Sequence, residues 1–261
     1  MRALDIAASG MLAQQMNVDV ISHNIANMNT TGYKRQRADF EDMLYQNIER
    51  PGSTSSASGA ILPSGIQLGV GVRADAVARI NEQGGLSQTG NPYDIAINGQ
   101  GFLQVQLPSG QTAYTRAGNF AINADGELVT ADGYPIKPSI TIPAETTAVQ
   151  ITRDGIVEVT LSGQTEPQQV GQIEIASFIN PGGLEAIGDN LYLETPASGS
   201  PNTATPGSPG LGTLMQGYLE ISNVNAVEEI SSLIVAQRAY EMNARVITAA
   251  DEMLQATTQL R

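Results

Sequence analysis

The stretch ALDIAASGMLAQQMNVDVISHNIANM, residues 3–28, repeats apolar side chains at spacings of three and four. A second stretch, from about 225 to 259, does the same near the other end of the chain. A seven-residue repeat of this kind places a seam of side chains along one face of a helix. The sequence therefore predicts two long terminal helices. The seam comprises Leu4, Ala7, Met11, Gln14, Val18, Ile21, Ile25 and Met28 in the first helix, and Ile230, Leu233, Gln237, Tyr240, Ala244, Ile247 and Leu254 in the second.

Local residues predict where these helices begin and end. The first is followed by Asn29-Thr30-Thr31-Gly32, a cluster of turn formers that closes on a glycine. The second begins near Asn225, because Asn225 and Glu228 have the spacing of a capping pair. Gly10 lies inside the first helix, where glycine costs about 1 kcal/mol relative to alanine. Either the helix tolerates this glycine, or its small size permits a close contact with another helix.

The region between the helices alternates apolar and polar residues, which predicts β-strands. Alternation is clear at 72–80, 93–97, 102–107 and 173–178. Turn signals separate such runs at residues 108–110, 124–126, 131–133 and 153–155, and the last three contain Asp-Gly. Asp-Gly between alternating runs is typical of a hairpin, because glycine takes the positive φ that the turn requires. We expect an α+β protein whose terminal helices pair like a coiled coil beside a central antiparallel all-β domain.

Two stretches are rich in Ser, Gly, Pro and Thr, residues 50–69 and 195–213. The first predicts an extended loop that neighbouring subunits hold in place, because long loops in compact chains are disordered or functional. Its candidate contact residues are Pro51, Gly52, Ile61, Leu62, Pro63, Ile66 and Leu68. The second stretch predicts a linker that returns the chain to the last helix. Residues 40–48 form a short apolar run of undecided type.

The predicted organisation has four segments. Residues 1–32 supply the first helix of a core domain used in assembly, and residues 220–261 supply its second helix. Residues 33–70 form a linker and extended loop, and residues 71–219 form the β domain.

A helical seam at each end of one chain needs a partner, either the other terminus or other copies of the chain. Burying one seam yields less free energy than the backbone entropy lost in ordering the helix. Gln14 and Gln237 weaken an isolated pair further. We therefore expect the apolar seam residues to be subunit-interface residues, and both helices to become fully ordered only when other subunits cover them.

Composition argues against several classes of protein. The formal net charge is −13 and cysteine is absent from the sequence, so neither the basic surface of a nucleic-acid-binding protein nor a disulfide framework is expected. Residues 51–219 carry 5 basic and 14 acidic side chains, which makes the middle of the chain its most acidic part. The chain has no run of 18 apolar residues, so direct membrane insertion is not expected. The N-terminus does not resemble a cleaved secretory signal.

Candidate catalytic motifs have simpler explanations. His23 is the single histidine and lies on the polar side of a helical pattern, so neither a catalytic triad nor a metal cluster is expected. Gly99-Gln100-Gly101 lies between two strand-like runs rather than before a helix, which indicates a turn rather than a phosphate loop. The acid pairs Asp125/Glu127 and Asp154/Glu158 begin in predicted hairpin turns. No catalytic residue, cofactor or metal site is predicted, and the chain is expected not to be an enzyme.

The basic run Tyr33-Lys34-Arg35-Gln36-Arg37 precedes Asp39, Glu41 and Asp42. We interpret it as a solvated or inter-subunit ion-pair strand rather than a phosphate site.

Both ends of the chain resemble the bacterial flagellar rod and hook family. At the N-terminal end, residues 11–15 (MLAQQ), 24–27 (NIAN) and 31–35 (TGYKR) are similar to its signature. At the C-terminal end, residues 222–225 (SNVN) and 237–243 (QRAYEMN) are similar as well, and so are 99–102 (GQGF) and 114–120 (YTRAGNF) in the middle. Within the family, the length and residues 46–69 are most similar to the distal rod subunit.

The resemblance implies a structural subunit of a rigid hollow helical tube that transmits torque from motor to hook. It also implies that terminal helices line the core, the β domain forms the shell, and residues 46–69 stiffen the tube. Export is implied to use the flagellar type III channel without a cleaved signal peptide. The implied location is the flagellar basal body, from the periplasmic space to the outer membrane. The implied partners are other copies of the chain, proximal rod proteins, the hook protein, periplasmic and outer-membrane ring proteins, the rod cap and the export apparatus.

Two alternatives stay open on the sequence. One is a proximal rod or hook-type axial protein. The other, from a different class, is a periplasmic carbohydrate-binding β protein, although an aromatic content of only 5% argues against stacking on sugars.

Overall fold

A computed structural model describes residues 2–50, 64–164 and 166–259. The chain divides into two compact units. Unit 1 combines residues 1–25 and 225–261 with residues 36–78, and unit 2 combines residues 26–35 with residues 79–224. The predicted α+β class is confirmed, because a helix at each end of the chain flanks antiparallel β-structure.

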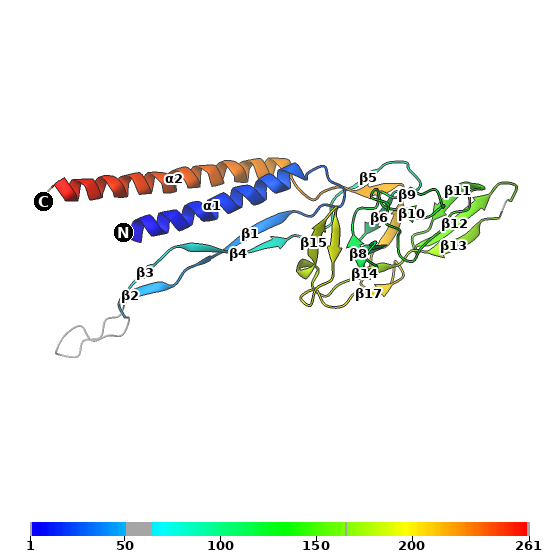
Figure 1. Cartoon of the computed structure of the whole chain (residues 1–261), viewed down its shortest axis with the longest axis horizontal. Helices are drawn as coiled ribbons and strands as arrows, with labels where there is room; N and C mark the ends of the chain where they lie inside the picture. Colours follow the sequence, from blue (N-terminus) through cyan, green and yellow to red (C-terminus); the bar gives the residue numbers. More distant parts are fainter. Residues whose placement is uncertain (1, 51–63, 165, 260–261) are drawn as a thin grey trace. The chain divides into compact units, whose positions relative to one another are not determined.

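Unit 1 contains two helices, α1 (Arg2–Ala26) and α2 (Ala226–Gln259), which lie side by side and antiparallel (Figure 1, blue and red). Gly10 of α1 approaches Asn243 of α2, and Asn24 of α1 contacts Glu229 near the opposite end of α2. The helix limits agree with the prediction except at the end of α1. Met28, expected in the helical seam, lies in the turn that follows Ala26 and is exposed.

Unit 1 also contains two β-ribbons. Strand β1 (Gln36–Asp42) pairs with β4 (Val72–Arg79), and β2 (Tyr45–Glu49) pairs antiparallel with β3 (Ile66–Gly69). The predicted loop was expected to reach residue 69, but residues 66–69 form strand β3, so the prediction is wrong there. Ile66 and Leu68 alternate with polar or small residues, which favours pairing with β2. The candidate loop residues Pro51, Gly52, Ile61, Leu62 and Pro63 lie outside the described residues.

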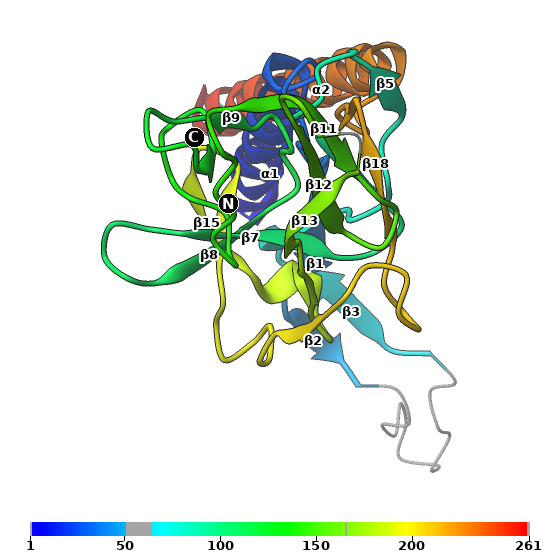
Figure 2. The same cartoon turned by 90° about the vertical axis from the view of Figure 1, so that its right-hand side faces the viewer.

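Unit 2 is built from antiparallel strands, as predicted (Figures 1 and 2). Its largest sheet has the order β15-β16-β8-β7-β14-β17, and a three-stranded sheet has the order β11-β12-β13. Three two-stranded pairs, β9/β10, β6/β18 and β5/β19, complete it. The strands are β5 (Leu86–Gln88), β6 (Ile95–Asn98), β7 (Phe102–Gln106), β8 (Thr112–Thr115), β9 (Ala121–Ile122), β10 (Leu128–Val129), β11 (Thr146–Ile151), β12 (Ile156–Leu161), β13 (Gln168–Gln172), β14 (Ile175–Ser177), β15 (Glu185–Gly188), β16 (Leu191–Leu193), β17 (Asn202–Ala204), β18 (Thr213–Gln216) and β19 (Tyr218–Glu220), with one 3-10 turn at Pro181–Gly183.

The four predicted turns lie at hairpins or reversals of the chain. Residues 108–110 connect β7 to β8, residues 124–126 connect β9 to β10, and residues 153–155 connect β11 to β12. At residues 131–133 the turn closes through a hydrogen bond from Thr130 N to the carbonyl oxygen of Tyr134. The short polar residues and glycines of these stretches thus reverse the chain, as turn chemistry predicts.

The predicted return linker is only partly a linker. Within residues 195–213, Asn202–Ala204 form β17, the edge strand that pairs with β14. Composition suggested a loop because Pro, Ser and Gly flank the strand on both sides. Three residues are enough to add an edge strand when a sheet already presents its backbone groups.

Unit 2 owes its stability to an aliphatic core and an aromatic cluster. The core is formed by buried side chains of many strands, among them Ile95, Leu103, Ile136, Ile173 and Leu214. The aromatic cluster consists of Phe102, Tyr114, Phe178 and Tyr192, whose rings pack edge to face with centroids 4.8–6.0 Å apart. Neither α1 nor α2, over the residues described, is both long and apolar enough to cross a membrane.

Candidate assembly surfaces

The contact between α1 and α2 is close at Gly10, and small residues are buried on both helices. Ala7 and Ala13 are buried on α1, and Ala236 and Ala250 are buried on α2. At Gly10, a Cβ atom would lie 2.8 Å from Nδ2 of Asn243. Of the two interpretations of Gly10, the close helix contact is therefore the correct one.

A buried polar contact also joins the two helices. Asn24 Nδ2 donates to Oε2 of Glu229 at 3.2 Å and to the carbonyl oxygen of Gln36 at 2.7 Å, and Asn24 Oδ1 accepts from Gln36 N at 2.9 Å. Asn24 and Glu229 are both almost completely buried. Asn24 thus fixes α1 against both α2 and the start of β1.

The sequence analysis did not select Asn24 or Glu229 for this contact. Their spacing could have identified them, because both lie at seam positions. Asn24 comes three residues after the seam residue Ile21, and Glu229 comes four residues before the seam residue Leu233. A polar residue on an apolar seam can specify register, which apolar side chains alone do poorly. The predicted cap of α2 is confirmed at Asn225, whose Oδ1 accepts a hydrogen bond from Val227 N at 3.1 Å.

A second apolar stripe runs along α2. Val235, Met242, Val246 and Met253 follow one another at spacings of seven, four and seven residues. At 100° per residue they fall within a narrow arc of the helix surface. These side chains are 47–68% exposed, so α1 does not cover them. A continuous apolar stripe on a solvent-exposed face indicates a contact surface.

The β2/β3 ribbon presents a further exposed apolar surface. Every residue of β2 is exposed, and so are Ile66 and Leu68 of β3. Leu44, just before β2, is 86% exposed. A two-stranded ribbon without a hydrophobic partner is only marginally stable in water. Its apolar side chains therefore favour packing against another surface.

A buried charge cluster joins three distant segments of unit 2. Lys34 Nζ lies 2.6 Å from Oε1 of Glu220, and Arg116 Nη1 lies 3.3 Å from Oε2 of the same carboxylate. All three side chains are at most 5% exposed. Lys34 Nζ also donates to the carbonyl oxygen of Glu82, and Glu220 Oε1 accepts from Gly84 N. Burial lowers the pKa of Lys34 and of Arg116, and the attraction of Glu220 opposes this shift for both.

The interpretation of residues 33–37 as a solvated or inter-subunit ion-pair strand is wrong for Lys34. Lys34 is buried and its partner Glu220 belongs to the same chain. Arg37 does form an exposed ion pair, with Asp39 at 2.9 Å. Lys34 differs from Arg37 because it lies next to Glu220, a partner 186 residues away in the sequence.

The chain matches known protein families and relatives at both ends and in the β region. Three family profiles match the chain: a flagella basal body rod protein profile at residues 4–34, a flagellar hook protein FlgE/F/G D1 domain at 96–159, and a flagellar basal body rod FlgEFG C-terminal profile at 215–260. The chain is 61% identical to the flagellar basal-body rod protein FlgG of Caulobacter vibrioides over 100% of both chains. It is 53% identical to FlgG of Agrobacterium fabrum over 97% of both chains.

The chain belongs to the flagellar basal-body rod family.

Within the rod family the similarity favours FlgG. The FlgF rod protein of Caulobacter vibrioides is 34% identical over 96% of this chain and 94% of its own length, against 61% for FlgG of the same organism. The profile at residues 4–34 covers most of α1 and reaches Lys34, and the one at 215–260 covers Glu220 and α2. The resemblance predicted from the sequence motifs is thus confirmed.

The seam residues predicted for this rod protein fall into three groups in the helix pair. The first group, Ala7 and Ile21, is buried. The second group is partly exposed and consists of Leu4, Met11, Val18, Ile25, Leu233, Ala244, Ile247 and Leu254. The third group, Met28, Ile230 and Tyr240, is exposed. The helix pair therefore leaves much of the larger apolar surface of both helices uncovered.

The motifs examined for catalysis occupy turns and helix surface in this rod protein. Gly99-Gln100-Gly101 connects β6 to β7, and Asp125 and Asp154 lie in hairpin turns. His23 is exposed on α1. No group of three or more His, Cys, Asp or Glu side chains within the described ranges could hold a metal ion.

Proposed function

We propose that this chain is the structural subunit of the distal rod of the bacterial flagellum, and that it polymerises through α1 and α2. Family membership and the full-length similarity to FlgG support the rod assignment. The observation that carries the assembly mechanism is the exposed stripe of Val235, Met242, Val246 and Met253. Its spacing is that of a helix-packing seam, and the α1/α2 pair leaves it uncovered.

The free energy available from burying this stripe supports a role in assembly. Burying a fully exposed aliphatic side chain of this size contributes about 1.5–3 kcal/mol. Because the four side chains of the stripe are 47–68% exposed, covering their remaining surface contributes roughly 4–7 kcal/mol before the cost of ordering. The buried apolar residues of α2 are Ala236 and Ala250, whose burial gains much less. Contacts with other copies therefore supply the larger share of apolar burial along α2, and the predicted seam residues of both helices serve as subunit-interface residues.

The exposed β2/β3 ribbon braces neighbouring subunits. In the polymer, residues 1–32 and 220–261 form the assembly domain, residues 33–70 the bracing segment and residues 71–219 the outer β domain. Such a rod, a hollow helical tube that crosses the periplasm, transmits torque to the hook. It contacts the proximal rod proteins, the hook protein and the ring proteins. This role is mechanical and requires no catalytic site.

Electron microscopy and sedimentation of the purified protein at high concentration test this function. The wild-type chain should form tubes, whereas Met242→Gln combined with Met253→Gln should raise the concentration needed for assembly. Glutamine keeps the length and the helix propensity of methionine while it removes apolar surface. Ile187→Gln, on an exposed apolar position of β15, is the matched control and should assemble normally. Equal assembly of the double variant and wild type would exclude the α2 stripe as the contact.

A further inference from the structure

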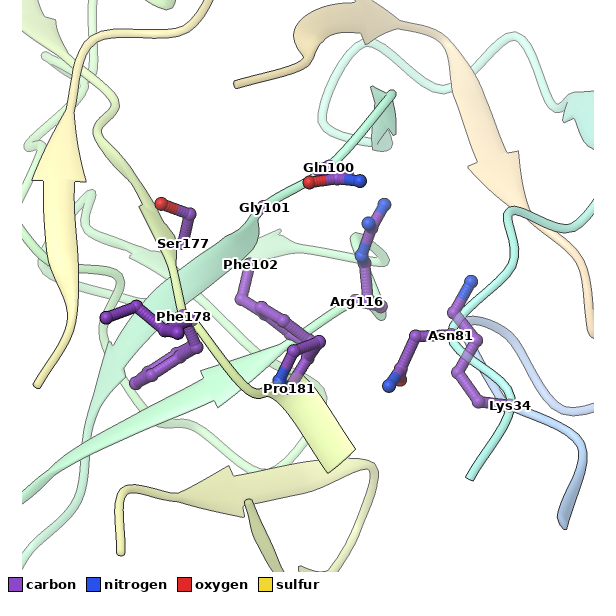
Figure 3. A pocket seen from close by; sticks show the side chains of 10 residues that line it. Lys34, Asn81, Gln100, Gly101, Phe102, Arg116, Ser177, Phe178 and Pro181 are labelled. Atoms are coloured by element: carbon purple, nitrogen blue, oxygen red, sulfur yellow. The ribbon is translucent and has the colours of Figure 1, made fainter. Parts of the chain in front are cut away.

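Unit 2 contains a cavity of about 200 Å³ beside the buried charge cluster. Figure 3 shows Lys34, Asn81 and Arg116 along one side of it and Phe102, Phe178 and Pro181 along the other. Gln100, Gly101, Ser177 and Ile179 complete the lining. The cavity is therefore lined by two cations, by polar side chains that can donate hydrogen bonds, and by an apolar wall. Among the residues that the structure describes, none of those lining the cavity is Asp or Glu.

The charges around this cavity do not balance. Lys34 and Arg116 share one carboxylate, Glu220, which lies within hydrogen-bond distance of both. An ammonium group has three N–H donors, and Lys34 uses two of them, on Glu82 and Glu220. Arg116 Nε is buried and has no hydrogen-bond partner among the described residues. A buried cluster with one excess positive charge is costly unless another anion approaches it.

The size and the walls of the cavity define the missing anion. Small-molecule sites usually measure about 300–1,000 Å³, so a cavity of about 200 Å³ suits a single side chain better than a whole ligand. Ile179 at its rim is 95% exposed, and with Phe178 and Pro181 it offers apolar surface to an aliphatic stem. The chain carries 26 acidic against 13 basic side chains, so copies of the chain are a rich source of carboxylates.

We infer that this cavity receives the carboxylate of an acidic side chain from a second copy of the chain. The inference rests on the proposed polymerisation and adds to it a specific contact on the β domain, distinct from the helix stripe. The carboxylate completes the charge balance of Lys34 and Arg116, and the amide groups of Asn81 and Gln100 can donate hydrogen bonds to it. The apolar rim packs on the methylene groups of the same side chain.

Asn81→Asp tests the inference by placing a carboxylate in the cavity from within the chain. This change is nearly isosteric and should raise the melting temperature of the monomer, because it neutralises the excess charge. It should also raise the critical concentration for assembly by about tenfold, because the introduced carboxylate already occupies the cavity that would receive the acidic side chain of a second copy. Gln168→Glu, on an exposed position of strand β13, adds the same charge away from the cavity and should do neither.

A second measurement probes the site without polymerisation. N-acetyl-glutamate amide, titrated into the full-length monomer, should shift the NMR signals of the Gly101 and Ser177 amides in wild type and in Gln168→Glu, and should leave those of Asn81→Asp unchanged. The inference is overturned if wild type shows no shift, or if Asn81→Asp and Gln168→Glu assemble alike. Failure of wild type to form tubes while the probe still binds would instead count against the rod function and leave the carboxylate site standing.

Discussion

Lys34 and Glu220 lie 186 residues apart in the sequence, yet their charged groups meet at 2.6 Å in the interior of unit 2. Arg116 approaches the same carboxylate from the end of β8. One acidic side chain therefore holds together the segment after α1, the central sheet and the segment before α2. Because the three groups are buried, removing one of them should destabilise the folded protein far more than removing one partner of a surface ion pair.

Glu220→Gln should destabilise the protein by about 3–5 kcal/mol, because it leaves two buried cations without a carboxylate. Urea unfolding of the purified chain measures the change. Asp39→Asn, which breaks the exposed pair with Arg37, is the matched control and should cost less than about 1 kcal/mol. Similar losses for both variants would show that burial does not set the strength of the Glu220 contacts.

Gly10→Leu should weaken the helix pair by about 1–3 kcal/mol, since a side chain at this position meets Asn243. Amide hydrogen exchange in α1 is the direct readout, and protection should fall along the helix. Ala8→Leu places the same side chain on an exposed position of α1 and should change protection little. If Gly10→Leu kept full protection, the close contact would not contribute to helix pairing.

Stability should fall as the pH rises above 10, in part through two tyrosines. Burial raises the pKa of Tyr114 and of Tyr192 above the ordinary value of 10.0. Between 10 and the higher folded-state pKa, the unfolded chain loses these protons while the folded chain keeps them, so the free energy of unfolding decreases.

The double change Tyr114→Phe and Tyr192→Phe should flatten this alkaline decline. Urea midpoints measured from pH 8 to pH 12 provide the comparison, and the difference between the two proteins should stay constant from pH 8 to 9. If the free energy of unfolding of the double variant fell with pH as steeply as that of wild type, the decline could not be attributed to Tyr114 and Tyr192.

Leu44→Ser combined with Leu68→Ser should leave the stability of the monomer within about 1 kcal/mol of wild type, because both positions are exposed. It should, however, make assembled rods more flexible or shorter, since the β2/β3 ribbon would lose apolar surface for its neighbours. The persistence length in electron micrographs is the measurement. Straight rods of normal stiffness from this variant would exclude the ribbon as a brace; Ile187→Ser serves as the control.

Periodic and local features could be predicted well. The helical repeats gave α1 and α2 to within about two residues, Asn225 capped α2 as expected, and the Asp-Gly turns lie where hairpins reverse. These features depend on neighbouring residues alone. The β3 and β17 strands were missed because each pairs with a strand elsewhere in the chain, and Ser- and Pro-rich flanks obscured a weak local pattern.

The amino-acid sequence alone is enough to establish the class of the protein: two helices with apolar repeats, an antiparallel β region, an acidic composition and the motifs of the rod family. Which side chains face inward depends on the folded chain. The fold leaves the large seam residues Ile230 and Tyr240 exposed and buries Ala236 and Ala250 instead, and it buries Asn24 with Glu229 and Lys34 with Glu220. Hydrophobic spacing defines a helix face only broadly, whereas burial of a small residue or a charge requires a partner that the fold brings from far along the chain.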